Sequence, residues 1–267
     1  MGIKNAVALI TGATSGMGAE FARRWAKEGY DLVITGRRRD LINKLAGEIE
    51  QACKVKVEVV IAELSDDQDL NSLVEKVKGI GNLEVLVNNA GFGSAKPFKE
   101  EDLDKLEKMF KVHCIAPMRL TQAALPAMLK RGSGYIINVS STLAIMMMPY
   151  QSGYSASKAF VKNFTEVLAM ELAGAGIKVQ ALCPGLTRTD FQKRLGIEAQ
   201  EHEKDIPEAA WMTPEEVVDI SLKDLEAGKV VCIPGFTNKI MCELPMVMPS
   251  SWYAGMMRKM TEHDKKK

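Results

Sequence analysis

Short apolar runs alternate with amphipathic stretches along most of the chain. A helical periodicity predicts helices near residues 17–28, 40–53, 67–78, 101–130 and 154–173. Between them, seven runs rich in β-branched residues predict strands at 6–11, 31–36, 55–62, 85–89, 135–140, 178–183 and 229–233. Several of these runs are apolar at nearly every position, which is typical of parallel strands covered on both faces.

This alternation predicts an α/β fold, in which a Rossmann-like, doubly wound sheet of seven parallel strands forms the middle of three α/β/α layers. We expect one catalytic domain over residues 1–238, with a flap inserted at about 188–227. Within the flap, "TPEE" predicts a helix that is capped by Thr213 and has Pro214 at its first position. Residues 239–267, rich in Met and Pro, are expected to form a C-terminal appendage.

Composition excludes several classes of function. A formal net charge of +1 gives no electrostatic reason to expect a nucleic-acid partner. The five cysteines are scattered without a CxxC spacing, so we expect neither a disulfide framework nor a metal site. No stretch resembles a signal peptide or is long enough to cross a bilayer, which favours a cytoplasmic protein.

The stretch "TGATSGMG", from Thr11 to Gly18, lies between the first predicted strand and the first predicted helix. A loop that binds a pyrophosphate needs a close approach of its backbone and a helix N-terminus that faces the charge. We therefore expect a dinucleotide to contact Gly12, Thr14, Ser15, Gly16, Met17 and Gly18. The alternative is a glycine-rich turn that binds no ligand.

The end of the second strand, "VITGRRR", indicates which dinucleotide is bound. Sheets that bind NAD usually place an acidic residue here to hold the ribose 2′-hydroxyl, whereas this chain has Gly36 followed by arginines. A guanidinium pairs with a 2′-phosphate, so we expect NADPH rather than NADH, with Arg37 as the main contact and Arg38 as support. The alternative, a solvated basic helix start, opposes the helix dipole.

The stretch "YSASK" places Tyr154 and Lys158 on one face of a predicted helix. A nearby ammonium group favours the phenolate and lowers the pKa of a tyrosine, which makes the phenol usable as an acid or base. Ser141 stands thirteen residues before Tyr154, at the end of the fifth predicted strand. A nicotinamide ring bound to the sheet would project at this edge.

Five motifs in this order resemble the short-chain dehydrogenase/reductase family: "TGATSGMG", "NNAG", "INVSS", "YSASK" and "CPGLTRT". The resemblance extends from residue 5 to about residue 235. It is strongest to a branch with "NNAGFG" and "IPGxxNK", whose members are named generically or as ketoacyl reductases. It implies a Rossmann-like fold, a nicotinamide cofactor, and NADPH-dependent hydride transfer between a carbonyl and an alcohol.

The resemblance also implies roles for individual residues. Tyr154 would donate the proton in carbonyl reduction, Lys158 would lower its pKa and hold the nicotinamide ribose, and Ser141 would bind the carbonyl oxygen. Further cofactor contacts are implied at Glu63, Leu64, Asn89, Ala90, Gly91, Pro184, Gly185, Thr187 and Thr189. Glu63 stands where the family usually has Asp. Family habit implies a homodimer or homotetramer formed through the helices that bear residues 113 and 154.

One departure from the family pattern concerns the fourth catalytic position, which is usually an Asn that helps to position a water beside the lysine. This sequence reads "VHCIA" and places His113 there. A neutral imidazole has one donor and one acceptor nitrogen and could hold such a water. Two interpretations remain: His113 substitutes for the Asn, or it marks weakened catalysis. In the second case the protein would be an NADP-binding regulatory or structural protein.

An apolar substrate wall is expected from Phe92, residues 144–150, Phe191 and Trp211, which favours a long or bulky hydrophobic carbonyl substrate over a sugar. The three consecutive methionines at 146–148 could line this cleft or pack elsewhere in the core or at a subunit interface. The C-terminal Met/Pro stretch could cover a partner subunit, cap the pocket or contact a membrane surface.

Overall fold

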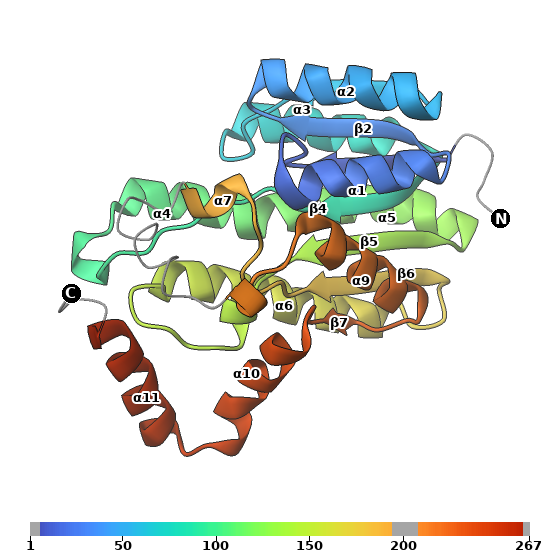
Figure 1. Cartoon of the computed structure of the whole chain (residues 1–267). Helices are drawn as coiled ribbons and strands as arrows, with labels where there is room; N and C mark the ends of the chain where they lie inside the picture. Colours follow the sequence, from blue (N-terminus) through green and yellow to red (C-terminus); the bar gives the residue numbers. More distant parts are fainter. Residues whose placement is uncertain (1–5, 194–207, 264–267) are drawn as a thin grey trace.

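The computed structural model describes residues 6–193 and 208–263. In this part of the chain seven strands form one parallel sheet in the order β3-β2-β1-β4-β5-β6-β7 (Figure 1). The strands are β1 (Val7–Thr11), β2 (Asp31–Gly36), β3 (Val57–Ile61), β4 (Leu83–Asn88), β5 (Gly134–Val139), β6 (Ile177–Leu182) and β7 (Val231–Cys232). The predicted doubly wound parallel sheet is therefore confirmed.

Helices cover both faces of the sheet and bury their apolar sides against it. Residues of α1 (Gly16–Lys27), α2 (Arg39–Cys53) and α9 (Pro214–Glu226) share one hydrophobic core with one sheet face. The opposite core contains residues of α3 (Asp67–Gly79), α5 (Ala116–Arg131) and α6 (Ser152–Glu171). The two cores explain why the central strands are apolar at nearly every position.

Two predicted elements differ from those in the structure. The edge strand predicted at 229–233 contains only two residues, because it pairs with β6 at Ala181 and Leu182 alone. The long helix predicted at 101–130 is divided into α4 (Leu103–Phe110), a π-helical turn η2 (Lys111–Ile115) and α5. Short helical segments also occur as η1 (Phe98–Glu100), η3 (Thr142–Ala144), α7 (Asp190–Lys193) and η5 (Glu208–Ala210).

The start of α9 follows the sequence prediction. The Thr213 hydroxyl accepts a hydrogen bond from the Glu216 amide at 3.2 Å, and the Glu216 carboxylate accepts one from the Thr213 amide at 2.8 Å. This reciprocal capping box fixes the start of the helix predicted within the flap. Residues 194–207 of that flap lie outside the described part of the chain.

Two helices after the sheet project from the domain as an open V (Figure 1). They are α10 (Phe236–Val247), which begins after Gly235 at a positive φ of 87°, and α11 (Ser250–His263). Tyr253 and Met257 of α11 are almost fully buried, whereas Trp252 is exposed. None of the helices within the described residues is long and apolar enough to cross a membrane.

Glycine is required at the start of α1 because the loop before it packs closely against the loop after β4. A Cβ atom on Gly18 would overlap the side-chain amide of Asn89 and the carbonyl oxygen of Gly12. At Gly12, where φ is +67°, a Cβ atom would lie 2.8 Å from the Cα atom of Ala90. The two loops therefore meet in backbone contact at the point where the strand order reverses, between β1 and β4.

We expect Gly18→Ala to lower the free energy of unfolding by about 2 kcal/mol, because the added methyl group overpacks this contact. The matched control is Gly47→Ala on the exposed side of α2, where a Cβ atom would meet nothing within 4 Å. That substitution should stabilise the protein by roughly 0.5–1 kcal/mol through helix propensity. Urea unfolding of both variants measures the difference, and equal stabilities would contradict the packing argument.

Candidate active site

The glycine loop has the local geometry expected for binding an anion. Gly12 and Gly16 both adopt positive φ values, and α1 begins at Gly16 without an acidic residue in its first turn. The Ser15 hydroxyl makes no capping bond to the helix and instead accepts one from Arg38. A Cβ atom on Gly16 would lie 2.9 Å from Cγ2 of Thr189, so the predicted contact residue Thr189 lies directly on the loop.

The two arginines of "GRRR" point in different directions. The Arg38 guanidinium donates hydrogen bonds to the hydroxyls of Thr14 and Ser15 at 2.5 and 2.7 Å, and it lies 3.5 Å from the Asp190 carboxylate. Arg37 donates instead to the Glu63 carboxylate at 2.7 Å. The residue predicted as supporting is therefore the one that contacts the glycine loop.

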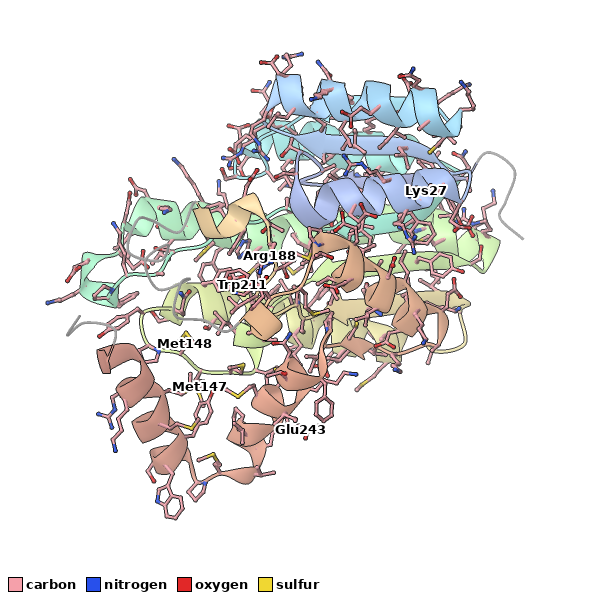
Figure 2. The ribbon with its side chains drawn as sticks, viewed as in Figure 1. Lys27, Met147, Met148, Arg188, Trp211 and Glu243 are labelled. Atoms are coloured by element: carbon pink, nitrogen blue, oxygen red, sulfur yellow. The ribbon has the colours of Figure 1, made fainter. Side chains whose placement is uncertain are left out.

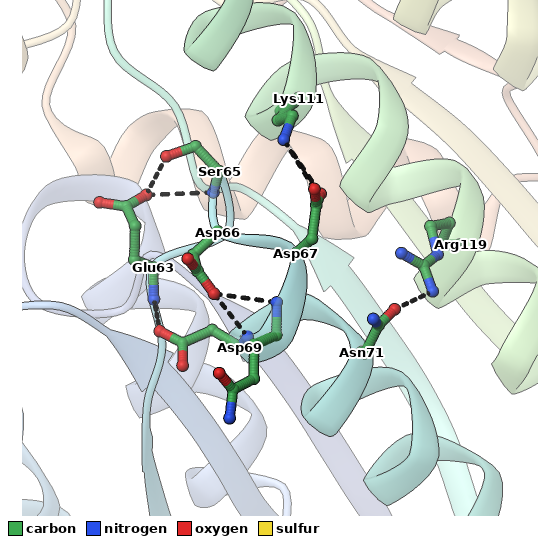
Figure 3. Close-up of polar contacts among 9 residues, drawn as sticks. Glu63, Ser65, Asp66, Asp67, Asp69, Asn71, Lys111 and Arg119 are labelled. Carbon is green, nitrogen blue, oxygen red and sulfur yellow. Dashed lines mark hydrogen bonds and ion pairs between the residues drawn. The ribbon is translucent and has the colours of Figure 1, made fainter.

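Glu63 is held in place before α3 by a network of its own (Figure 3). Its carboxylate also accepts bonds from the amide and hydroxyl of Ser65, and its amide donates to Asp69 at 2.8 Å. Burial raises the pKa of Glu63, but the bonds from Arg37 and Ser65 outweigh that effect and leave the pKa below its usual value. Asp66 caps α3 with two backbone bonds, and the adjacent Leu64 is buried.

Asn89, which follows β4, joins its loop to the end of β1. Its side-chain amide donates to the carbonyl oxygens of Thr11 and Gly12 at 3.0 and 3.1 Å. The Thr11 hydroxyl accepts from the amides of Asn89 and Ala90 at 2.9 and 3.0 Å. This side chain therefore fixes the shape of the glycine loop, a role that the motif "NNAG" did not predict.

Ser141, Tyr154 and Lys158 come together at the carboxyl edge of β5, as predicted. Ser141 follows β5, and its hydroxyl is hydrogen-bonded to the Tyr154 phenol. The Lys158 ammonium nitrogen donates to the Val139 carbonyl oxygen at 2.9 Å and lies 5.8 Å from the centroid of the Tyr154 ring. All three side chains are buried.

Burial dominates the electrostatics of this group. It raises the pKa of Tyr154 to about 12, against a smaller lowering by the Ser141 hydrogen bond, so the expected lowering of this pKa by Lys158 is wrong. It lowers the pKa of Lys158 to about 8, since the charged ammonium loses its hydration. At neutral pH the phenol therefore holds its proton, while the ammonium group remains largely charged.

His113 lies in the π-helical turn and is fully buried beside this group. Its Nε2 accepts a hydrogen bond from the Phe92 amide at 3.2 Å, and its Nδ1 lies 2.8 Å from the Ser157 hydroxyl. Burial, followed by the nearby Lys158 charge, holds the pKa of His113 well below its usual value. A Cβ atom on Gly91 would lie 2.9 Å from Nε2, which explains the glycine at that position.

The loop after β6 carries the remaining predicted contacts and is tied to the appendage. The Pro184 carbonyl accepts a bond from the Thr142 amide at 3.0 Å, and the Thr187 hydroxyl donates to the Gly185 carbonyl at 3.1 Å. A Cβ atom on Gly185 would overlap the side chain of Asn238, whose amide donates to the Pro234 carbonyl at 2.7 Å. Asn238, from the motif "IPGFTNK", therefore packs the start of α10 against the loop after β6.

An apolar wall surrounds the Tyr154 ring. Phe92, Leu143 and Phe191 pack with the buried side chains of Leu106 and Met109, and the Phe191 ring centroid lies 5.9 Å from that of Tyr154. Two of the predicted wall residues, Phe92 and Phe191, are therefore beside the phenol.

Three other predicted wall residues, Trp211, Met147 and Met148, make different contacts. Trp211 stacks on the Arg188 guanidinium at 5.5 Å, and the two side chains lie together in Figure 2. Met147 and Met148 lie on the side of their loop that faces α10 and α11 (Figure 2). Tyr253 of α11 is almost fully buried, and its phenol lies near the Met147 backbone. The methionine loop therefore lies beside the appendage.

Sequence reasoning missed two residues of the site, Ser157 and Asn238. Ser157 is the fourth letter of "YSASK", and its hydroxyl links His113 to the backbone of Tyr154. Neither residue type is diagnostic by itself, and both act through partners that are distant in sequence. Among the described residues, no group of three or more His, Cys, Asp or Glu side chains is placed to hold a metal ion.

The residues present fit a nicotinamide dinucleotide. The glycine loop places backbone amides at the N-terminus of α1, where they can bind a pyrophosphate, and the cationic Arg38 lies beside this loop. The Ser141–Tyr154–Lys158 group lies at the same carboxyl edge of the sheet.

Comparisons with known proteins agree with this site. A sequence model of the "short chain dehydrogenase" family matches residues 6–200. The 3-oxoacyl-[acyl-carrier-protein] reductase of Aquifex aeolicus is 32% identical over 222 residues, which are 82% of this chain and 90% of the relative. Sulfoacetaldehyde reductase 2 of Chromohalobacter salexigens is 35% identical over 188 residues, covering 69% and 74% of the two chains.

Solved structures show the same fold. A short-chain dehydrogenase from Sphingobium yanoikuyae in complex with NADPH has a TM-score of 0.80 at 30% identity, covering 96% of this chain and 95% of that one. The bulky-bulky ketone specific alcohol dehydrogenase of Comamonas testosteroni has a TM-score of 0.77 at 28% identity and covers 98% and 94%. L-sorbose reductase of Gluconobacter frateurii, complexed with NADPH and L-sorbose, has a TM-score of 0.75 at 28% identity and covers 87% and 95%.

The family match extends over residues 6–200, which make up most of the chain. The chain therefore belongs to the short-chain dehydrogenase family and is an NAD(P)-dependent oxidoreductase that acts in carbonyl–alcohol chemistry.

Proposed function

We propose that this protein is an NADPH-dependent reductase that converts a bulky, hydrophobic ketone or 3-ketoacyl compound into an alcohol. The observation that carries the proposal is the buried Ser141–Tyr154–Lys158 group at the carboxyl edge of β5, within an apolar wall. Bound NADPH would supply a hydride to the carbonyl carbon. The C=O π bond then becomes a C–O single bond, and the oxygen takes a proton from Tyr154.

Each side chain of the group has a distinct part in that step. The Ser141 hydroxyl donates a hydrogen bond to the carbonyl oxygen, where negative charge develops. The Tyr154 phenol gives its proton to that oxygen and becomes a phenolate. The Lys158 ammonium stabilises the phenolate, and the Val139 carbonyl holds the ammonium in position.

Preference for NADPH is supported by the charges beside the glycine loop. Arg38 donates hydrogen bonds to the hydroxyls of Thr14 and Ser15, whereas Arg37 donates to the Glu63 carboxylate. A 2′-phosphate would find a guanidinium donor in Arg38, and a second one in Arg37 in competition with the Glu63 carboxylate. The NADPH complexes of the Sphingobium and Gluconobacter relatives agree with this proposal.

A bulky substrate is supported by two observations. Phe92, Leu143 and Phe191 pack against the apolar cluster that contains the Tyr154 ring, and such an apolar surface suits a hydrophobic substrate. In addition, the 12 residues of α10 and the 14 of α11 make up about a tenth of the chain. The bulky-ketone dehydrogenase covers 98% of the chain and so includes most of these helices, whereas L-sorbose reductase covers 87%. The neighbour named for bulky ketones therefore has counterparts to most of the appendage, which supports a large substrate.

A homodimer or homotetramer is proposed on the outer face of α5 and α6. This face exposes apolar side chains that a monomer would leave in water, and it contains a groove. The exposed residues are Ile115, Leu129, Phe160, Val167 and Met170, and the groove is lined by Met118, Phe160, Asn163, Phe164, Val167, Leu168 and Glu171. An apolar patch of this kind is typical of a protein–protein contact.

We expect Tyr154→Phe to lower kcat at least about a hundredfold, because it removes the proton donor and little else. The test follows NADPH oxidation with a steroid ketone, an aryl alkyl ketone, a 3-ketoacyl thioester and a small keto sugar, with the first three favoured. Tyr135→Phe, at the other end of β5, is the matched control and should keep its activity. Undiminished turnover in Tyr154→Phe would refute the mechanism.

If instead NADPH binds tightly and the wild-type protein turns over none of these compounds, the alternative of an NADP-binding regulatory protein is favoured.

For cofactor choice, Arg37→Ala and Arg38→Ala should each weaken NADPH binding roughly tenfold more than NADH binding, because each removes a charged donor for the 2′-phosphate. Fluorescence titration with both cofactors measures the four dissociation constants. Arg39→Ala, at the third arginine of the run, is the matched control. Equal losses for NADPH and NADH would overturn the assignment.

For assembly, the Val167→Glu/Met170→Glu double variant should be a monomer, because two carboxylates would have to be desolvated in the contact between subunits. Size-exclusion chromatography with light scattering gives the mass. The control is Leu41→Glu, which places a charge at an exposed apolar position of α2 on the opposite face of the sheet. A monomeric wild-type protein would contradict the proposal, as would an equal loss of mass in the control.

A further inference from the structure

The hydrogen bonds around His113 fix which of its nitrogens carries a proton. A backbone amide can only donate, so Nε2, which accepts from the Phe92 amide at 3.2 Å, carries no hydrogen. In a neutral ring the proton then resides on Nδ1, which donates to the Ser157 hydroxyl oxygen 2.8 Å away. His113 is therefore the neutral Nδ1–H tautomer, and both of its nitrogens are satisfied by protein groups.

The same direction continues through Ser157. Its hydroxyl has one hydrogen, and this is donated to the Tyr154 carbonyl oxygen at 2.7 Å. If the ring proton were on Nε2 instead, it would point at the hydrogen of the Phe92 amide. Ser157 would then have to donate its single hydrogen to Nδ1, and the Tyr154 carbonyl would lose its bond from Ser157. One directed chain therefore runs from Phe92 through His113 and Ser157 to the backbone of Tyr154.

This chain acts on the first turn of α6. Tyr154 is the third residue of the helix, whose N-cap, Gln151, makes no side-chain capping bond. The preceding Tyr150 has a positive φ of 65°. The Ser157 hydroxyl donates to the backbone carbonyl of Tyr154, so it adds a direct bond to the residue that carries the phenol.

We propose that Ser157 is a positioning residue, and that His113 and Ser157 form a neutral clamp that fixes Tyr154 relative to the loop at Phe92. The inference rests on the proposed function of Tyr154 as proton donor. It assigns the His113 ring a role other than holding a water, because both ring nitrogens are already bonded. The proton relay of the enzyme therefore does not pass through this imidazole.

The surroundings of His113 favour the neutral ring. The titratable groups that face it are Lys158 and Tyr154 of α6. A protonated ring would be a second buried cation beside Lys158 and would turn Nε2 into a donor against the Phe92 amide.

The first test is spectroscopic and does not depend on activity. The chain has three histidines, so selective ¹⁵N labelling gives few signals, and His113→Asn assigns the one from residue 113. We expect the shifts of a proton on Nδ1 and a bare Nε2, unchanged between about pH 5 and 8, where an ordinary histidine titrates. A proton on Nε2, or titration in this range, would overturn the clamp.

The second test is a double-mutant cycle of Ser157→Ala and His113→Asn in the full-length enzyme. Ser157→Ala should lower kcat by roughly ten- to a hundredfold through misplacement of Tyr154, while KM and the NADPH dissociation constant stay within about twofold. The double variant should be no slower than the slower single variant, because both substitutions break one chain. Multiplied losses, or an unchanged kcat in Ser157→Ala, would overturn the proposal.

Ser155→Ala is the matched control, since it removes a buried hydroxyl of the same helix that has no hydrogen-bond partner among the described residues. It should leave kcat unchanged. If Ser155→Ala lowers kcat as much as Ser157→Ala does, the loss comes from general packing of α6 and the proposal is overturned. Failure of the proposed function is distinguished by Tyr154→Phe: if that variant turns over normally, Tyr154 is not the donor, whatever the ¹⁵N spectrum shows.

Discussion

A buried ammonium group at the carboxyl edge of the sheet is the constraint on which the rest of the site depends. Lys158 is only 4% exposed, and burying a cation costs several kcal/mol unless polar partners compensate for the lost water. Its nitrogen donates to the Val139 carbonyl at the end of β5, and its own carbonyl accepts from Ser140 at 2.7 Å. The lysine therefore locks α6 onto β5, and Tyr154, one helical turn earlier, is carried over the same edge.

The carboxyl ends of β1, β4 and β5 are stabilised in a similar way, by short polar side chains that bond to one another inside the domain. The Asn88 amide donates to the Asn138 side chain at 2.8 Å, and the Asn138 amide donates to Thr165 of α6 at 3.0 Å. Thr11 and Asn89 join the glycine loop to β4. Because buried polar groups are costly when unpaired, these bonds fix the relative positions of the strands that carry the site.

The sequence predicted those parts of the protein that depend on local patterns. Apolar runs gave all seven strands, the capping box gave the start of α9, and the spacing of Ser141, Tyr154 and Lys158 gave a group that the fold brings together. The edge strand β7 was predicted too long because its length depends on how far β6 extends beside it. The π-helical turn at Lys111–Ile115 left no sign in the apolar periodicity, which continues through it.

Contacts between distant residues could not be predicted. Arg37 and Arg38 are adjacent and chemically identical, and they differ only because Glu63, twenty-six residues away, captures Arg37. The partners of His113 belong to the loop after β4 and to α6, so the motif "VHCIA" could not show that both ring nitrogens are occupied. In each case one or two long-range bonds decide which of two plausible roles a side chain takes.

The raised pKa of Tyr154 is compatible with its proposed role as an acid. A phenol with a pKa of about 12 is still much more acidic than an ordinary hydroxyl group, for which water, at 15.7, gives the scale. An alkoxide-like oxygen therefore takes the proton readily, whereas the phenol keeps it while the substrate is a neutral ketone. In the proposed reaction, the apolar wall that buries the ring would delay proton transfer until charge develops on the oxygen, and the buried ammonium group of Lys158 would then stabilise the phenolate that remains.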